Sequence, residues 1–427
     1  MSRSSSSGTQ ARAAWDELEA IVGSEHLRVA APADVVDGVA ASRVVAPGST
    51  AELGRVLACA GAARMAVIPR GGGTKLAWGA PPVRADLIVS TARLDRMLEH
   101  AWEDMTATVE AGCTVARLQR TLAEHGQRLA IDALWPDRAT IGGILATNDS
   151  GPLRARFGSL RDLLIGVTLA LPDGTLAKSG GKVVKNVAGY DLPKLATGSF
   201  GTLGVITQAV FRLHPLPHDS HTVTFTAPTV ESLCTLSLAI QGSPLAFLAQ
   251  QLRAGTAPVS ALDVGFEGTP AGLEAQQRRV AQLAGRLSMT QSPPHVWRVR
   301  ETLWEGDPVA VVKFSVLPTR LADCCAAVRQ VGESCGLDWA LVALGLGVGQ
   351  LRLGPGNSDA LVAAFERLRA RLEALGGTLV LLRSPREVKA RCDVWGSPGD
   401  ALPLMRRVKQ QLDPGGVLNP GRFVGGI

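Results

Sequence analysis

The feature that most constrains the fold is a glycine loop at residues 69–75, with the sequence PRGGGTK. A strand-like apolar run at residues 66–68 leads directly into it. A dinucleotide fingerprint of the G-x-G-x-x-G kind must open a helix. Here one glycine and two prolines within residues 79–82 break the chain, and a further strand is predicted at residues 86–89. The sequence therefore argues against a Rossmann site at this loop.

A run of glycines lets successive backbone amides point into one concavity, because no Cβ atom obstructs left-handed dihedral angles or a ligand. Residues 71–74 suit a pyrophosphate in this way, with Arg70 or Lys75 balancing its charge. Glycine-rich hairpin loops that bind nothing are also common. The loop by itself leaves both interpretations open.

The chain around the loop carries clear secondary-structure signals. Residues 43–69 predict a strand, a helix and a strand, because Ser49 and Glu52 form a capping box ahead of an apolar helical stripe. A helix is also expected from Thr114 to Gly126. Further strands are predicted at residues 107–110, 163–171, 175–178 and 203–213, with a hairpin turn at residues 172–174.

A length of 427 residues predicts two or three domains. Two prolines within residues 214–217 mark the best boundary, and the alternating strand-like and helical runs beyond it are typical of an α+β domain. The expected domains are a tail and lead-in at 1–37, disordered over residues 1–12, a first domain at 38–217, a smaller α+β domain at 218–400 and a C-terminal segment at 401–427.

Composition excludes several classes of protein. The net charge of +6 is spread without a run of five like charges, which argues against a nucleic-acid-binding protein. Seven cysteines without a C-x-x-C pair favour neither a disulfide framework nor a metal or iron–sulfur site, and they suit a reducing compartment. No apolar run approaches the ~18 residues of a membrane span. We therefore expect a cytoplasmic protein without direct membrane insertion.

A second glycine-bearing region strengthens the interpretation of the first loop as a ligand-binding loop. The sequence WPDRATIGGILATNDSG at residues 135–151 is followed by RFGSLRD, LPDG and GSFGTLGVITQAVFRL, and LDPGGVLNPGR stands near the C-terminus. In this order the motifs resemble the flavoproteins of the vanillyl-alcohol oxidase type, whose FAD domain has the PCMH-type fold. The stretch at residues 180–204 is most similar to the FAD-binding subunits of bacterial glycolate oxidases.

The resemblance implies an α+β protein with a two-subdomain PCMH-type FAD-binding domain, a smaller cap domain of antiparallel sheet and helices, and a C-terminal segment returning to the FAD domain. It implies FAD held by Arg70, Gly71, Gly72, Gly73, Thr74 and Lys75, with Pro136, Thr140, Gly142, Gly143, Gly151 and Gly158 on the other subdomain, Ile206 by its backbone, and Asn419 near the isoalloxazine. Neither loop contains a histidine or cysteine, so non-covalent FAD is expected.

The function implied is a subunit of a glycolate oxidase that oxidises glycolate or another small 2-hydroxy acid, together with a second flavin subunit and an iron–sulfur subunit that could attach it to the membrane. Two alternatives stay open: a non-catalytic assembly subunit, and a stand-alone FAD-linked lactate dehydrogenase. Related enzymes carry a metal-binding H-x-G-D-G-N-x-H motif where residues 344–352 have no histidine or acid. No catalytic residue and no metal ligand is therefore assigned.

Three further groups are weaker candidates. Arg300 and Lys313 resemble the positions where relatives bind the substrate carboxylate. A lysine-rich stretch at residues 178–194, with Lys182, Lys185 and Tyr190, is either a solvated loop or a site for the flavin edge or a partner subunit. The histidines at 214, 218 and 221 lack a fourth ligand, so we do not expect a zinc site.

Overall fold

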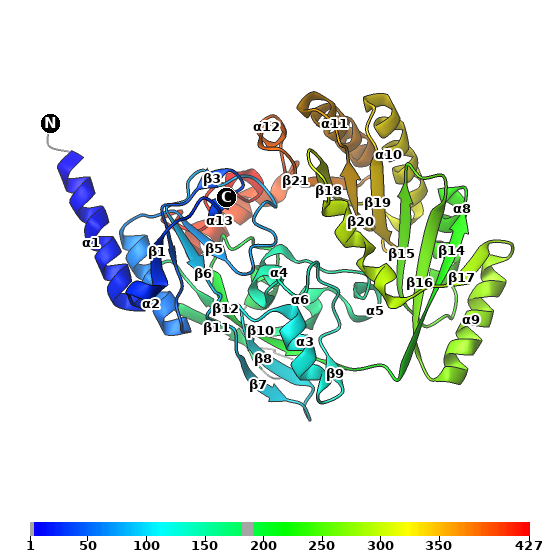
Figure 1. The fold of residues 1–427 in the computed structure, drawn as a ribbon, viewed down its shortest axis with the longest axis horizontal. Coiled ribbons are helices and arrows are strands. Elements are labelled where there is room, and N and C mark those ends of the chain that lie inside the picture. The colour runs from blue at the N-terminus through cyan, green and yellow to red at the C-terminus, as the bar shows by residue number, and fades with distance from the viewer. Residues whose placement is uncertain (1–3, 182–190) are drawn as a thin grey trace. The chain divides into compact units, whose positions relative to one another are not determined.

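The computed structural model describes residues 4–181 and 191–427, which form two compact units (Figure 1). The first unit contains the chain up to Ser150, Ser159–Pro215 and Ser397–Ile427, and the second contains Gly151–Gly158 and Leu216–Gly396. The chain passes from the first unit to the second after Pro215, two residues before the boundary expected after residue 217. One short segment, Gly151–Gly158, belongs to the second unit, whereas the sequence placed it in the first.

A four-stranded sheet of the first unit carries the glycine loop at the end of one strand. Its order is β1 (Leu27–Val29), β4 (Arg43–Val45), β6 (Leu87–Ser90) and β5 (Val67–Arg70), with β4, β6 and β5 parallel. Helix α2 (Thr50–Ala62) connects β4 to β5. Half of its predicted capping box is present, because Glu52 N donates to Ser49 Oγ at 3.1 Å, whereas Glu52 Oε2 accepts from Gly48 N at 2.7 Å rather than from the N-cap amide.

The C-terminal segment extends this sheet beyond β5. Val67 N donates to Val417 O at 2.8 Å, and Asn419 N donates to Val67 O at 2.9 Å, in a parallel bridge between Val67 and Leu418. The open edge of β5 is therefore paired, and Asn419 is brought to the strand end from which the glycine loop leaves.

A second, antiparallel sheet of the first unit has the order β11-β10-β12-β8-β7. Its strands are β7 (Met97–Ala101), β8 (Thr106–Glu110), β10 (Leu164–Ala170), β11 (Leu176–Gly180) and β12 (Val205–Arg212), and the predicted hairpin joins β10 to β11. Helices α3 (Val115–Ala123) and α4 (Ile141–Thr147) follow β8, and α7 (Leu192–Ala196) precedes β12. Short pairs join β2 (Val35–Val36) to β3 (Val39–Ala40) and β9 (Gln127–Arg128) to β13 (His214–Pro215).

The core of the first unit joins both sheets and two helices. Leu53 and Leu57 of α2 pack with Leu87 of β6 and with Val205 of β12, all at most 2% exposed. Leu18 of α1 belongs to the same cluster. Helix α1 (Ser4–Val22) begins at Ser4, so the expectation of disorder over residues 1–12 is wrong from Ser4 onward. The apolar contacts of its second half give the helix a support that the serine-rich composition does not predict.

The second unit is built on one eight-stranded antiparallel sheet, which agrees with the predicted α+β class. The order is β17 (Ser288–Gln291), β14 (Asp219–Ala227), β16 (Ser260–Gly268), β15 (Phe247–Gly255), β19 (Trp339–Leu344), β20 (Val348–Leu353), β18 (Ala310–Ser315) and β21 (Thr378–Arg383). Helices α8 (Val230–Gln241), α9 (Pro270–Ala284), α10 (Leu321–Cys335) and α11 (Ser358–Ala374) cover one face of it (Figure 1).

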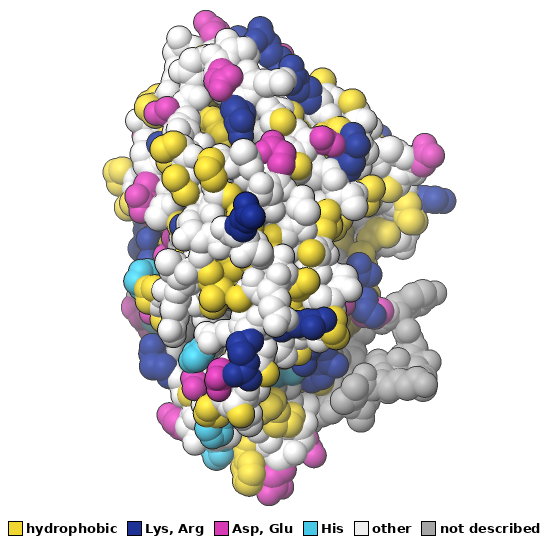
Figure 2. All heavy atoms as spheres, turned by 90° about the vertical axis from the view of Figure 1, so that its right-hand side faces the viewer, with side chains coloured by type: hydrophobic (Ala, Val, Ile, Leu, Met, Phe, Trp, Pro, Cys, Tyr) yellow, Lys and Arg dark blue, Asp and Glu magenta, His cyan; other side chains and the backbone are white. Residues whose placement is uncertain are grey.

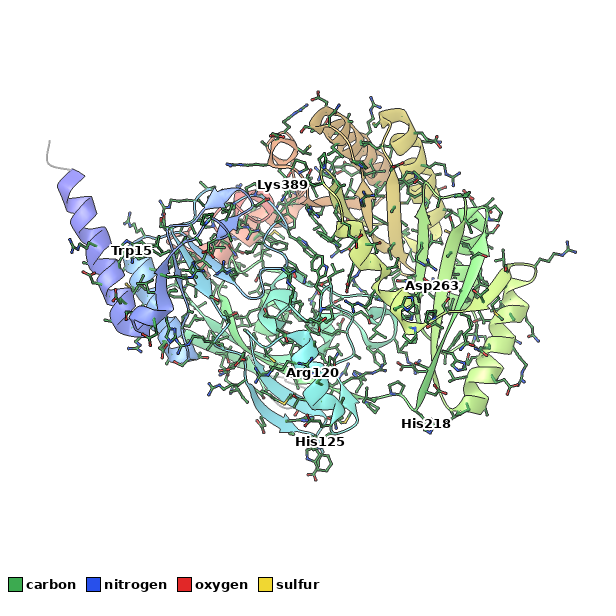
Figure 3. All side chains as sticks on the ribbon, viewed as in Figure 1. Trp15, Arg120, His125, His218, Asp263 and Lys389 are labelled. Carbon is green, nitrogen blue, oxygen red and sulfur yellow. The ribbon has the colours of Figure 1, made fainter. Side chains whose placement is uncertain are left out.

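The other face of this sheet carries a polar network around Asp263, which is fully buried in β16 (Figure 3). Arg253 donates to both oxygens of this carboxylate at 2.7 and 2.9 Å, and Thr224 and Gln251 donate at 2.7 and 2.8 Å. These partners satisfy a buried charge in the middle of a sheet.

The surface agrees with the charge pattern of the sequence. Figure 2 shows Lys and Arg side chains interspersed with Asp, Glu and apolar side chains over the face drawn there. Among residues 4–181 and 191–427, no helix combines the length and apolarity needed to cross a membrane.

Candidate functional site

Two adjacent hollows lie in the first unit, where the glycine loop, helix α4, the turn before β12 and the C-terminal segment meet. Each has a volume of about 70 Å³, so each accommodates only one section of a large, elongated ligand. The hollows share six lining residues, which are Pro69, Gly71, Gly143, Ala146, Phe200 and Asn419. One ligand can therefore follow both.

The glycine loop packs directly on the segment that leads into α4. A Cβ atom added to Gly71 would lie 2.0 Å from Thr140 Oγ1, and one added to Gly72 would lie 1.8 Å from Arg138 O. Glycine is thus required at both positions for contact between the two loops, rather than for approach of a ligand. Gly73 differs, because its φ is +71° and no atom lies within 3.8 Å of an added Cβ.

The arginine of the loop is held by an internal carboxylate. Arg70 donates to Asp34 Oδ1 at 2.6 Å, and Asp34 also accepts from Arg28 and from Ala31 N. Hydrogen bonding from Arg28, together with that from Arg70, keeps the pKa of Asp34 well below its usual range, so its carboxylate stays charged. Arg70 is therefore held by an internal ion pair, with a carboxylate that it shares with Arg28.

The lysine of the loop forms a buried ion pair with the second glycine-bearing region. Lys75 Nζ lies 3.2 Å from Asp149 Oδ2, and both side chains are at most 5% exposed. The ammonium lies 5.6 Å from the ring centroids of Trp78 and Trp135, and Leu134 N donates to the same Asp149 oxygen at 2.9 Å. This ion pair joins the two loops that the sequence assigned to one cofactor.

Several polar groups of residues beside the hollows have no hydrogen-bond partner within the described chain. Thr140 Oγ1 and Asn419 Oδ1 are buried and have no hydrogen-bond partner among the described residues. The amides of Gly72, Gly73 and Thr74 likewise donate to no acceptor in the part of the chain that the structure describes. Buried side-chain oxygens are normally paired, whereas Gly72 and Gly73 are exposed, so their amides can be reached by a polar ligand.

Arg422 closes the site from the C-terminal side. Its guanidinium is buried and donates to the carbonyl oxygens of Leu76, Trp78 and Ala80, which fixes the chain just after the glycine loop. Burial lowers its pKa to about 10, still far above neutrality. Asn419, with φ +46°, donates from Nδ2 to Phe200 O at 2.5 Å. The C-terminal segment therefore forms one wall of the site.

Most residues expected to bind the cofactor come together here. The hollows are lined by Arg70, Gly71, Gly72, Gly73, Thr74, Lys75, Thr140, Gly142, Gly143, Ile206 and Asn419. Pro136 does not line them, and its carbonyl accepts from Ala116 N at 2.9 Å. Gly151 and Gly158 belong to the second unit. For these three residues a role at the cofactor stays a prediction.

Further lining residues were not assigned from the sequence. They are Pro69, Leu76, Thr91, Ala146, Thr147, Phe200, Gly201, Gly204, Val205 and Arg422. Several stand inside motifs that carried the family resemblance, which was a usable signal for Gly201 and Arg422. Phe200 stands in the same motif as Gly201, but its left-handed φ of +55°, which is rare for a bulky residue, is visible only in the structure.

The predicted substrate-binding residues lie in the second unit. Arg300 is buried in the 3₁₀ helix η2 (Pro294–Trp304). Lys313 lies on β18, directly opposite Gln350 of β20. Gln350 belongs to residues 344–352, which contain no histidine or acid. The structure leaves the roles of Arg300 and Lys313 as predictions.

The remaining candidates form no site among the described residues. In residues 4–181 and 191–427 no three His, Cys, Asp or Glu side chains gather to hold a metal ion. His221 Nδ1 lies 3.0 Å from Gln277 Nε2, and burial lowers the pKa of His214, helped by Arg212 and Arg128. Lys194 pairs with Asp191. Lys182, Lys185 and Tyr190 lie outside the described residues.

The site fits the expected FAD. It offers unpartnered backbone amides on a glycine loop, two unpartnered side-chain oxygens and two connected hollows. Since Arg70 and Lys75 are paired internally, the amides and neutral side chains would carry the direct contacts to a pyrophosphate.

Two family models match this chain. Residues 41–180 match an FAD binding domain, and residues 397–423 match the C-terminal domain of FAD linked oxidases. The two matches cover the glycine loop and the C-terminal wall of the hollows, respectively.

Curated relatives match over most of their length. The glycolate oxidase subunit GlcD of Bacillus subtilis is 25% identical, with 89% of this chain and 88% of that protein covered. The D-lactate dehydrogenase of Archaeoglobus fulgidus is 28% identical, with coverage of 89% and 91%. The D-2-hydroxyglutarate dehydrogenase of Xanthomonas citri pv. viticola is also 28% identical, with coverage of 89% and 88%.

Solved structures share the fold at low identity. p-Cresol methylhydroxylase with substrate bound superposes with a TM-score of 0.78 at 16% identity, covering 97% of this chain and 96% of that one. An alkyldihydroxyacetonephosphate synthase gives a TM-score of 0.75 at 19% identity, with coverage of 96% and 86%.

Proposed function

Because this chain is an FAD-linked oxidoreductase with a PCMH-type fold, we propose that it acts on a small 2-hydroxy acid, with glycolate as the first candidate. One observation carries the proposal: three relatives that match nearly end to end are named for glycolate, D-lactate and D-2-hydroxyglutarate. These compounds share a hydroxyl group beside a carboxylate. They differ in the group attached to the carbon that carries the hydroxyl. The comparisons therefore support 2-hydroxy acids as a substrate class better than they support any one acid.

In this chemistry, the residues of the protein bind and orient the cofactor and the substrate. FAD, when bound, supplies a two-electron acceptor that can pass electrons onward one at a time. The loop amides and Asn419 would hold that group, and the internal pairs of Arg70 and Lys75 keep the loops in place. Arg300 and Lys313 are our candidates for the substrate carboxylate, since an arginine fork suits two carboxylate oxygens. No residue of this chain is proposed as the base.

Electrons would leave through other polypeptides. Five of the seven cysteines are buried, and burial raises the pKa of Cys59, Cys234 and Cys324 to about 12, which suits inert core thiols. We therefore propose a complex with a second flavin subunit and an iron–sulfur subunit. The buried free thiols suit the reducing cytoplasm, with any membrane association made through these partners.

A non-catalytic assembly subunit is the second candidate. It is favoured by residues 344–352, which form the β19–β20 hairpin without a histidine or acid. In that case the chain would keep its FAD site while a sister flavin subunit oxidises the substrate.

One experiment separates the candidates. The purified chain, alone and with its partners, is mixed anaerobically with glycolate, D-lactate or D-2-hydroxyglutarate, and its flavin absorbance is recorded. Bleaching of the flavin of this chain by at least one acid supports the proposal, and the rates rank the substrates. A flavin that stays oxidised with all three, in a complex that turns over, supports the assembly role instead.

A further inference from the structure

Lys409 lies on a surface helix, yet its ammonium reaches inward. Helix α13 (Leu402–Leu412) has no fully buried residue, but the Lys409 side chain is only 12% exposed. Nζ donates to Thr202 O at 2.7 Å, to Leu418 O at 3.0 Å and to Asp413 Oδ2 at 2.5 Å. One cation thus joins three segments of the first unit.

Thr202 belongs to the turn that forms one wall of the hollows. The turn is contorted, because Gly198, Phe200 and Gly201 all have positive φ values between 55° and 81°. Its other side is fastened to α4, since Gly198 N donates to Leu145 O at 2.8 Å and Phe200 N to Ala146 O at 2.9 Å. Backbone in such sparsely populated regions persists only where its surroundings hold it.

Leu418 belongs to the opposite wall and directly precedes Asn419. Asn419 also has a positive φ, of +46°, and its Nδ2 donates to Phe200 O. The two strained segments therefore hold each other at the bottom of the hollows. Asn419 Oδ1 is left with no partner among the described residues and lines both hollows.

Asp413 completes the arrangement. Its side chain is fully buried and accepts from Val417 N at 2.9 Å and Leu418 N at 2.8 Å, besides Lys409. Burial lowers the pKa of Lys409, and Asp413 opposes that shift. The ammonium group is therefore desolvated, and hydrogen bonds to its three acceptors offset the free-energy penalty. A lysine whose only task was to neutralise Asp413 would not need the carbonyl of Thr202.

We propose that Lys409 is a positioning residue for the cofactor: by joining Thr202 to Leu418 it seats the C-terminal segment against the 198–202 turn and so sets Asn419 for FAD. The segment and FAD are then coupled, and each strengthens the binding of the other by the same factor. This inference requires FAD binding alone and is independent of which hydroxy acid is oxidised.

Three variants test it in the full chain. Lys409→Met removes the ammonium and leaves Asp413 charged and buried. Lys409→Met with Asp413→Asn removes both charges, and so relieves the penalty of an unpaired carboxylate. Arg407→Met, at an exposed position of the same helix, is the control. Affinity is measured by titrating FAD into apoprotein and following flavin fluorescence.

We expect FAD to bind at least about 5-fold more weakly to both Lys409 variants, the lower end of typical coupling factors, and normally to the control. Wild-type affinity in the double variant would overturn the proposal, because the effect of the single change would then reflect the stranded carboxylate. If the single variant fails to fold, the FAD affinity of the double variant alone tests the proposal.

A second readout reports the segment itself. FAD should protect residues 413–427 of the wild-type chain from limited proteolysis, and the protection should shrink in the double variant while its bound flavin shows an altered absorption envelope. Equal protection in the two proteins, with an unchanged flavin spectrum, would show that Lys409 does not position the segment.

Discussion

Replacing Gly143 by alanine should move stability and cofactor affinity in opposite directions. Gly143 lies within α4 and lines both hollows. A Cβ atom built there meets one described atom within 4 Å, Thr140 Oγ1 at 3.2 Å. The methyl group therefore requires Thr140 Oγ1 to shift by a few tenths of an ångström, and it enters the space assigned to FAD.

The magnitudes follow from these contacts. Alanine in place of a helical glycine stabilises by roughly 0.5 to 1 kcal/mol, so the free energy of unfolding of the apoprotein should stay level or rise by up to about 1 kcal/mol. Forcing an extra methyl group into a filled site typically costs about 1 to 3 kcal/mol. We therefore expect FAD affinity to fall roughly 5- to 150-fold.

The assay combines denaturant unfolding of the apoprotein with FAD titration. Gly142→Ala is the matched comparison, because its Cβ would lie 2.9 Å from Ala111 Cβ and should lower stability. Wild-type FAD affinity in Gly143→Ala would refute the placement of the cofactor in these hollows. A clear loss of apoprotein stability would instead refute the claim that Thr140 yields to the added methyl group.

The remaining predictions concern charge, pH and the flavin linkage. Lys75→Met should destabilise the apoprotein by about 3 kcal/mol in denaturant unfolding, because Asp149 is left buried and unpaired, and adding Asp149→Asn should recover part of the loss; no recovery would contradict the ion-pair argument. The pKa of His214 is lowered from 6.5 by burial and by Arg212 and Arg128, so the unfolded state takes up this proton first and stability falls as pH drops below 6.5. His214→Gln should show a shallower acid slope in thermal unfolding between pH 6.5 and 5 than the wild type, and equal slopes would count against this assignment. Acid precipitation should release all flavin into the supernatant, since no His or Cys among the described residues lines either hollow, whereas flavin on the pellet would reveal a covalent bond.

Local signals in the sequence predicted much of the first unit. The N-cap at Ser49 and the turn at residues 172–174 specify contacts within a few residues, and both are present. The breaks at residues 79–82 correctly excluded a helix after the glycine loop. Such features depend on backbone preference and nearest neighbours, which a sequence states directly.

The central strands of the second unit were harder to predict. Strands β15 and β16 contain Gln250, Gln251 and Asp263, polar residues that interrupt the apolar pattern of a buried strand. The burial of Asp263 is tolerated because Arg253 of β15 and Thr224 of β14 donate to its carboxylate. That compensation depends on which strands are neighbours in the sheet, and the spacing of apolar residues in the sequence does not reveal the strand order.

The sequence by itself determined where a cofactor loop could stand, while the tertiary structure decided what each of its residues does. Gly71 and Gly72 make room for a second loop, Arg70 and Lys75 are paired with Asp34 and Asp149, and Lys409 reaches Thr202 across 207 positions of the chain. A motif records which residue types are present. Burial removes a charge from water, so a buried charge needs a partner. Which distant residue supplies that partner depends on long-range packing.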